Sequence, residues 1–180
     1  MIDYTILGNS LKYYKKAGFQ KVEVPWYVPE YIDKITNPCR SFKIDNNDDK
    51  CIVGSGEQGF LYMYSEGKLD KGMYQSITPC YRVEDVYDEL HKVYFIKNEL
   101  IMTNDVGYYA LGYVIECAKN FFESYGIQTD IVKTSESSYD IECDGIELGS
   151  YGIRNCEFLS WIYGTGCAEP RFTTVINKYK

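Results

Sequence analysis

The sequence contains little of what metal centres and disulfide frameworks are built from. It has one histidine in 180 residues, and its seven cysteines are odd in number and form no Cys-x-x-Cys pair. Zinc sites and disulfide-stabilised folds usually show regular Cys or Cys/His spacing. We therefore expect neither of them, and we interpret the cysteines as reduced thiols that serve as small core residues.

Long apolar runs and a signal peptide are also missing. No stretch approaches the roughly 20 apolar residues that a membrane-spanning helix needs. The N-terminal sequence MIDYTILGNSLKYYKK lacks the basic start and apolar middle of a signal peptide. Hydrophobic residues make up 45% of the chain and aromatic residues 16%. This composition predicts one globular domain over residues 1–180, located in the cytosol and away from membranes.

Positive charge is scarce as well. The chain has 19 Lys and Arg against 26 Asp and Glu, which gives a formal net charge of −7. A broad nucleic-acid surface needs clustered Lys and Arg to contact phosphates. The basic cluster at Lys12–Lys16 lies on a predicted helix, where such a cluster is more often a solvated face. Extensive nucleic-acid binding by this domain alone is therefore not expected.

The segment Thr78–Glu99 carries a pattern that is typical of a ligand-binding β-hairpin. If residues 76–84 and 91–101 are antiparallel strands, alternation puts Arg82 and Glu84 on one face. Four residues share a parity on the return strand: His91, Phe95, Lys97 and Glu99. Such a face supplies a forked donor for phosphate, a flat ring for a base and acceptors for amino groups. The alternative is a half-exposed hairpin with a solvated charged face.

A second hairpin is predicted at Asp144-Gly145, a dipeptide that favours a two-residue turn. Closing this turn pairs Cys143 with Ile146 and Glu142 with Glu147, and Asp140 shares the face of the two glutamates. Like charges directly opposite each other are destabilising unless water or a cation separates them. A magnesium ion bridged to nucleotide phosphates would resolve the repulsion. A solvent-exposed acidic ladder is the alternative.

The remaining elements follow from periodicity and from helix stop signals. We expect a helix over Thr5–Lys16 that stops at Gly18, and then a strand over Lys21–Trp26 with Pro25 at a sheet edge. Residues Lys43–Lys50 are expected to form a loop. Further along, we expect a helix with Asn104 as N-cap and Gly126 as stop, and a short helix opened by Gly164-Thr165-Gly166. The glycine-rich segment Gly54–Gly59 is predicted to be a loop that approaches a small ligand. There Glu57 could bind an ammonium group, although a plain surface turn has the same pattern.

Six segments of the chain, in this order, resemble the catalytic core of class II aminoacyl-tRNA synthetases. They are Gly18-Phe19-x-x-Val22-x-Val24-Pro25, Ser55-Gly56-Glu57, Arg82-x-Glu84 with Phe95 and Glu99, Tyr139-Asp140-Ile141-Glu142, Glu147-x-Gly149-Ser150, and Gly164-Thr165-Gly166 followed by Arg171. The resemblance covers nearly the whole chain. It is nearest to the seryl, glycyl, prolyl and threonyl branch.

The resemblance implies an α+β fold with a mostly antiparallel sheet, and a homodimer formed through the Pro25 region. It also implies roles for single residues. Catalytic roles fall on Arg82 at the α-phosphate, Glu147 at magnesium and Arg171 at the γ-phosphate. ATP would further contact Glu84, His91, Phe95 and Ser150; the amino acid would contact Ser55, Glu57 and Glu99; and Glu142 would join Glu147 at the metal. The short acidic loop Asp85–Leu90, and His91 in place of a basic loop residue, depart from the family pattern.

The implied reaction is activation of a small amino acid by ATP with magnesium, which gives an acyl-adenylate and pyrophosphate. The enzymes of this family normally add a further domain for tRNA, for which residues 1–180 leave no room. An acidic chain without such a domain favours a non-tRNA acceptor, such as a carrier protein, another protein or a small amine. Two alternatives stay open: a minimal or split tRNA synthetase, and a non-catalytic accessory subunit.

Overall fold

Strands with regular alternation build most of this α+β fold. The computed structural model describes residues 1–37, 41–44, 47–83, 87–90 and 92–179. Their helices are α1 (Tyr4–Lys16), α2 (Glu30–Thr36), α3 (Gly56–Ser65), α4 (Tyr108–Glu123) and α5 (Arg171–Tyr179). No helix among these residues is long and apolar enough to cross a membrane.

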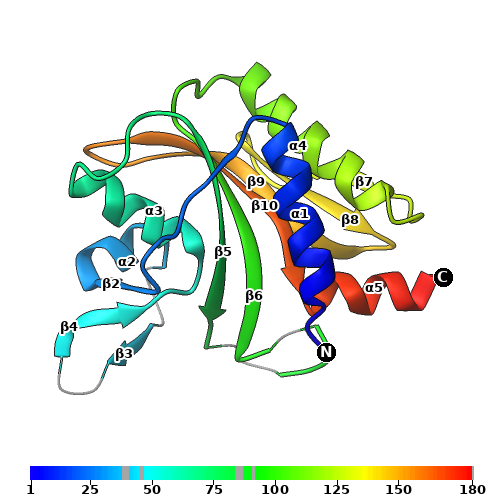
Figure 1. The fold of residues 1–180 in the computed structure, drawn as a ribbon, viewed down its shortest axis with the longest axis horizontal. Helices are drawn as coiled ribbons and strands as arrows, with labels where there is room; N and C mark the ends of the chain where they lie inside the picture. Colours follow the sequence, from blue (N-terminus) through cyan, green and yellow to red (C-terminus); the bar gives the residue numbers. More distant parts are fainter. Residues whose placement is uncertain (38–40, 45–46, 84–86, 91, 180) are drawn as a thin grey trace.

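A seven-stranded sheet with the order β1-β5-β6-β10-β9-β8-β7 forms the centre of the molecule (Figure 1). Its strands are β1 (Gln20–Lys21), β5 (Met73–Tyr81), β6 (Tyr94–Met102), β7 (Asp130–Lys133), β8 (Ser138–Cys143), β9 (Ile146–Asn155) and β10 (Ser160–Glu169). Only the β1–β5 pairing is parallel among these described strands. The predicted α+β class with a mostly antiparallel sheet is therefore confirmed.

The two faces of this sheet are covered differently. Helices α1, α4 and α5 pack on one face, where residues such as Leu7, Val114 and Phe172 form an apolar core with Leu100 and Ile162 of the sheet. A smaller core on the other face joins Phe60 of α3 to Ile101 and Trp161. A three-stranded sheet, formed by β2 (Tyr27–Pro29), β3 (Phe42–Ile44) and β4 (Asn47–Ile52) in the order β2-β4-β3, lies beside α2 and α3. The second face is thus only partly covered by helices.

Local signals set the first helix. Asp3 caps α1 by accepting hydrogen bonds from the backbone N–H groups of Thr5 and Ile6, and Gly18 follows the helix with a φ of +94°. Glycine adopts this left-handed backbone conformation without the steric cost that a Cβ brings. The predicted helix at Thr5–Lys16 and its stop at Gly18 are confirmed.

Both predicted hairpins are present. Asp144 and Gly145 have φ values of +49° and +75°, and Cys143 pairs with Ile146 while Glu142 pairs with Glu147. Beyond these pairs the register shifts, so that Asp140 lies opposite Ser150. In the other hairpin β5 pairs with β6, with Cys80 opposite Phe95. The strand bounds differ from the prediction, because β5 begins at Met73 and ends at Tyr81, and β6 begins at Tyr94 and ends at Met102.

Several element predictions were wrong. The strand expected over Lys21–Trp26 ends at Lys21, because only Gln20 and Lys21 have register partners on β5. The expected loop Lys43–Lys50 instead contributes to β3 and β4, where pairing across the small sheet overrides polar composition.

Two helix starts were misplaced as well. Helix α4 begins at Tyr108 with Gly107 as N-cap, later than Asn104 predicts, although its stop before Gly126 is confirmed. Gly164 and Gly166 lie within β10, and α5 starts only at Arg171. A Cβ at Gly166 would come 2.9 Å from the ring of Tyr14, so this glycine permits close packing of α1 on the sheet. The mistake lay in taking a packing glycine for a helix start.

Candidate functional site

Two adjoining pockets lie over the partly covered face of the sheet and form one cleft. The narrow pocket is lined by residues that include Phe95, Leu148, Pro170 and Arg171. The wide pocket, with a volume of about 540 Å³, is lined by residues that include Ser55, Glu57, Arg154 and Tyr163. The residues shared by both pockets are Arg82, Lys97, Glu147 and Thr165. A ligand in one pocket would therefore lie next to a ligand in the other.

Arg82 stands where the two pockets meet. Its Nε donates to the carbonyl oxygen of Gly54 at 3.1 Å, and its guanidinium carbon lies 5.2 Å from the centre of the Phe95 ring. These contacts fix the plane of the guanidinium group, and the exposed Arg82 side chain lines both pockets. The predicted juxtaposition of Arg82 and Phe95 on one face of the hairpin is present. Glu84 and His91 lie outside the described residues.

Glu147 and Arg171 form the far wall of the narrow pocket. Arg171 Nη1 lies 3.3 Å from Glu147 Oε1, and both side chains are partly exposed. Burial raises the pKa of Asp140, with a hydrogen bond to Ser150 opposing the shift and the charge of Glu147 adding to it. Glu142 lies opposite Glu147 in the ladder but lines neither pocket. Carboxylates therefore gather near the cleft, and Glu147 lines both of its pockets, while Glu169 lines the narrow pocket.

No cluster of three or more His, Cys, Asp or Glu side chains that could hold a metal ion exists within the described part of the chain. Magnesium usually needs only one or two carboxylates when substrate phosphates complete its coordination. Glu147, with Ser150 beside it on the wall of the wide pocket, fits such a site.

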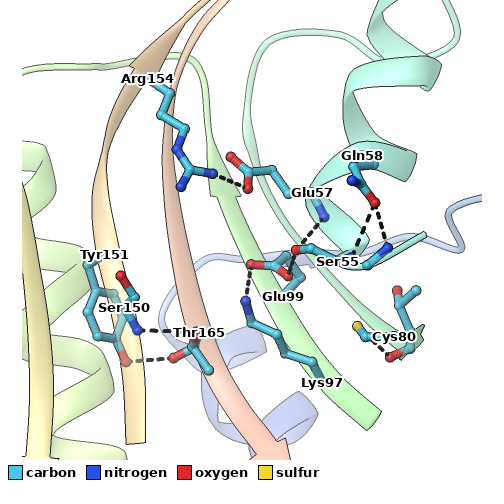
Figure 2. A network of polar contacts seen from close by, with 12 residues as sticks. Ser55, Glu57, Gln58, Cys80, Lys97, Glu99, Ser150, Tyr151, Arg154 and Thr165 are labelled. Atoms are coloured by element: carbon cyan, nitrogen blue, oxygen red, sulfur yellow. Dashed lines mark hydrogen bonds and ion pairs between the residues drawn. The ribbon is translucent and has the colours of Figure 1, made fainter. Parts of the chain in front are cut away.

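Glu57 is held inside the protein by two strong contacts. Its Oε1 accepts from Trp161 Nε1 at 2.6 Å. Its Oε2 lies 2.6 Å from Arg154 Nη1, a contact that Figure 2 shows. The side chain is buried, and this burial raises the pKa of Glu57 although the charge of Arg154 acts against the shift. Both carboxylate oxygens are thus engaged within the protein. Glu57 lines the wide pocket, where its carboxylate is paired with an arginine.

The segment that contains Glu57 is a helix start and not the predicted loop. Ser55 is the N-cap of α3, and its side chain forms a capping box with Gln58. The Ser-x-x-Gln spacing is a known signature of a helix N-terminus. Gly56 and Gly59 let α3 approach its neighbours, since a Cβ would come 2.8 Å from Thr78 Oγ1 at position 56 and 2.7 Å from the Pro25 carbonyl oxygen at position 59.

Glu99 is fully buried and contacts Ser55 and Lys97, two residues that line the wide pocket. Ser55 Oγ donates to Glu99 Oε2 at 2.5 Å, and Lys97 Nζ lies 2.9 Å from Glu99 Oε1 (Figure 2). Lys97 and Glu99 are close enough to form an ion pair, but their geometry is not that of a hydrogen bond. The buried Glu99 Oε1 therefore has no hydrogen-bond partner among the described residues. Glu99 therefore keeps an acceptor position that Glu57 does not have.

Among the cleft residues that were not predicted from the sequence as site residues are Lys97, Arg154 and Tyr163. Lys97 shares the parity of Phe95 and Glu99, which was a usable signal. Arg154 lies 97 residues from Glu57 in the sequence, and no local pattern joins them. Tyr163 lies on β10 opposite Gly152, within a segment whose glycines indicated a helix.

The chain resembles known proteins in structure and not in sequence. No family model matches the chain, and no curated protein sequence matches it. Solved structures match closely: seryl-tRNA synthetase from Pyrococcus horikoshii complexed with ATP has a TM-score of 0.74 at 16% identity, and pyrrolysyl-tRNA synthetase from Desulfitobacterium hafniense has 0.78 at 18%. The chain has the fold of a class II aminoacyl-tRNA synthetase catalytic domain. Serine-tRNA ligase from Naegleria fowleri in complex with AMP matches as well, with a TM-score of 0.74 at 16% identity.

The structural matches cover nearly all of this chain, but only part of the length of each neighbour. The matches cover 93% of this chain for the Pyrococcus enzyme, 97% for the Desulfitobacterium enzyme and 96% for the Naegleria enzyme. Conversely, this chain spans 48% of the length of the Pyrococcus enzyme, 69% of the Desulfitobacterium enzyme and 52% of the Naegleria enzyme. The shared part is therefore the fold, the sheet with its helices.

Proposed function

We propose that this protein activates a small amino acid with ATP, forming an acyl-adenylate and releasing pyrophosphate. The observation that supports this function is the single cleft in which Arg82 belongs to both pockets. A nucleotide in the narrow pocket and an amino acid in the wide pocket would meet at this guanidinium group. Two substrates held side by side react as if within one molecule, which can lower the barrier by several kcal/mol, on the order of 7 or more.

The proposed reaction is an in-line displacement at the α-phosphorus. A carboxylate oxygen of the amino acid attacks this phosphorus, the bond to the bridging oxygen breaks, and pyrophosphate leaves with the electron pair. Arg82 neutralises the charge that grows on the α-phosphate oxygens, because a planar guanidinium matches phosphate with two parallel donors. Phe95 offers a ring face for adenine, and Arg171 binds the γ-phosphate. No protein nucleophile is needed, because positioning and electrostatics carry the reaction.

Magnesium would neutralise charge on the phosphates when bound. Glu147 is the carboxylate that would hold it at the boundary of the two pockets, with Ser150 close by. Because the Arg171 contact to Glu147 is long and solvent-exposed, little is lost when Arg171 turns to a phosphate.

The ammonium group of the amino acid is assigned to Glu99 and Ser55. Glu99 Oε1 has a free acceptor position, whereas both oxygens of Glu57 are engaged. An ammonium group there would compete with Lys97 Nζ, which lies 2.9 Å from the same oxygen, and Lys97, like Arg82, lines both pockets. Glu57 then acts indirectly, through Arg154.

For the acceptor of the activated acid we propose a molecule other than tRNA, such as a carrier protein. The net charge of −7 supports this choice, because tRNA binding needs clustered positive charge. The second candidate is transfer to tRNA, which the three solved neighbours named above favour because each is a tRNA synthetase or ligase. Incubation of the labelled adenylate with total tRNA and, separately, with purified carrier proteins would tell the two acceptors apart.

Binding of ATP with magnesium is expected to stabilise the folded protein. A ligand that binds only the native state at a hundredfold excess over its dissociation constant adds about 2.7 kcal/mol. Thermal melting with millimolar ATP and magnesium should therefore show a higher midpoint, and ATP with a chelator should show a smaller shift. Pyrophosphate exchange, screened across the amino acids, would then detect the reaction. An unchanged midpoint together with no heat in calorimetry would show that the nucleotide site does not exist.

We also propose a homodimer through the Pro25 region. Trp26 and Tyr31 are 59% and 60% exposed next to this segment, and large exposed apolar side chains that gather in one place mark contact surfaces. Sedimentation should show a dimer that Trp26→Asp converts to a folded monomer. Tyr109→Asp is the matched control, because Tyr109 is a 98% exposed aromatic on α4. A monomeric wild-type protein, or a dimer that both variants retain, would contradict this interface.

A further inference from the structure

Arg154 is the side chain of the wide pocket that is held most firmly in one orientation. Its Nη1 lies 2.6 Å from Glu57 Oε2, and its guanidinium carbon lies 3.9 Å from the centre of the Tyr163 ring. Tyr163 can take this position because Gly152 lies opposite it; a Cβ at Gly152 would come 2.8 Å from the Tyr163 ring. An ion pair on one side and an aromatic ring on the other fix the guanidinium plane.

This fixed group faces the pocket with donors to spare. The side chain of Arg154 remains 40% exposed, and its one hydrogen bond among the described residues goes to Glu57. A guanidinium group carries several further N–H donors and no acceptor. The pocket therefore offers a hydrogen-bond donor at a set position, and it should select a ligand that brings an acceptor there.

The walls of the wide pocket argue against an apolar side chain. Besides glycine, the lining residues carry polar or charged groups with one aliphatic exception, Val83. Thr36 adds a buried hydroxyl oxygen that has no hydrogen-bond partner within the described ranges. An aliphatic side chain would strip water from these groups without replacing its hydrogen bonds. Such a mismatch costs far more in selectivity than a missing methyl group does.

The charges near Arg154 argue against a charged side chain. Arg154 and the buried Glu57 already neutralise each other. A substrate carboxylate would add a second negative charge beside Glu57, and an ammonium side chain would be placed against the guanidinium group. Both arrangements leave an uncompensated charge beside the buried Glu57 and its partner Arg154, which is unfavourable. A neutral acceptor adds no charge and still uses the free N–H donors.

We propose that the amino acid activated here has a neutral polar side chain, ending in a hydroxyl or a carboxamide, whose oxygen accepts a hydrogen bond from Arg154. Arg154 is then the specificity-determining residue, Glu57 and Tyr163 are the residues that position it, and Thr36 is a second polar contact. This inference rests on the proposed adenylate-forming function and names the substrate class of the same site.

Non-hydrolysable aminoacyl-sulfamoyl adenosines test the inference without requiring turnover. Isosteric pairs give the sharpest comparison: threonine against valine, and glutamine against both glutamate and methionine. Calorimetry on the intact protein should show that at least one neutral polar analogue binds tenfold or more tightly than its isosteres. Tighter binding of the valine, methionine, glutamate or lysine analogues would overturn the inference while leaving the adenylate site intact. If no analogue binds and ATP with magnesium does not bind either, the proposed function fails, and this inference fails with it.

A double variant tests the role of Arg154 itself. Arg154→Met alone leaves the buried Glu57 unpaired, which by itself can prevent folding. Glu57→Gln with Arg154→Met avoids this problem, because glutamine can still accept from Trp161. The double variant should fold, still bind ATP with magnesium, and bind the threonine and valine analogues equally. A double variant that still prefers the threonine analogue over the valine analogue would show that another residue recognises the substrate side chain. Arg154→Lys is the conservative companion, and it should restore part of the preference.

Discussion

Arg82→Lys is expected to slow adenylate formation by about a hundredfold or more, the size of the loss when one preorganised transition-state donor is removed. The substitution keeps the charge but removes the planar fork. A lysine ammonium cannot donate to the Gly54 carbonyl and to two phosphate oxygens in one plane, nor can it lie flat on Phe95. The rate is measured by pyrophosphate exchange at saturating ATP.

The fold should survive Arg82→Lys, because the side chain is exposed. Circular dichroism and the melting midpoint of the apo protein should match the wild type within experimental error. Lys12→Arg, an exposed change on α1 away from the cleft, is the control for handling and concentration. An Arg82→Lys protein with near wild-type exchange would remove Arg82 from the proposed mechanism.

Glu147→Gln should abolish magnesium-dependent activity, with a loss on the order of a hundredfold or more, comparable to removing another electrostatic contact to the transition state. The amide is a weak ligand for a hard cation. The free energy of unfolding of the apo protein should stay unchanged or rise slightly. The exposed Arg171 contact stabilises the protein by about 0–1 kcal/mol at most, and the repulsion between Glu147 and Glu142 disappears.

Glu142→Gln is the matched control for Glu147→Gln. It removes the other carboxylate of the same ladder pair, which lines neither pocket. A much smaller loss of activity in Glu142→Gln would assign the metal to Glu147 alone, and an equal loss would bring Glu142 into the metal site. If Glu147→Gln instead destabilises the apo protein and leaves exchange intact, then Glu147 is a structural residue. Complete absence of exchange in the wild type would favour a non-catalytic accessory subunit.

Parts of the fold that depend on neighbouring residues could be predicted from the sequence. The Asp144-Gly145 turn fixes its own register, because both residues must adopt positive φ and the pairs on either side follow. Alternation along β6 correctly grouped Phe95 and Glu99 with Arg82 on one face. The start of α3 was missed although its signal is present, since Ser55-x-x-Gln58 is a capping box within a glycine-rich stretch.

Features that depend on distant residues could not be predicted in the same way. Polar composition made Lys43–Lys50 resemble a loop, yet pairing of β4 with both β2 and β3 makes most of it strand. The role of Glu57 depends on Trp161 and Arg154, which lie about a hundred residues further along the chain on two other strands. A free carboxylate and one locked by an arginine have the same local sequence. Only the register of β9 with β10 brings Arg154 and Trp161 side by side.

The close packing of α3 mechanically couples the Pro25 segment to the amino-acid end of the cleft. Gly59 abuts the Pro25 backbone, and Gly56 abuts Thr78 on β5, so the first turn of this helix is wedged between the two. The two glycines are about 4.5 Å apart along the helix axis at a rise of 1.5 Å per residue. A displacement of the Pro25 segment on subunit association would carry Ser55 and Glu57 with it, and through them the contacts to Glu99 and Arg154. Assembly and substrate affinity would then vary together with protein concentration.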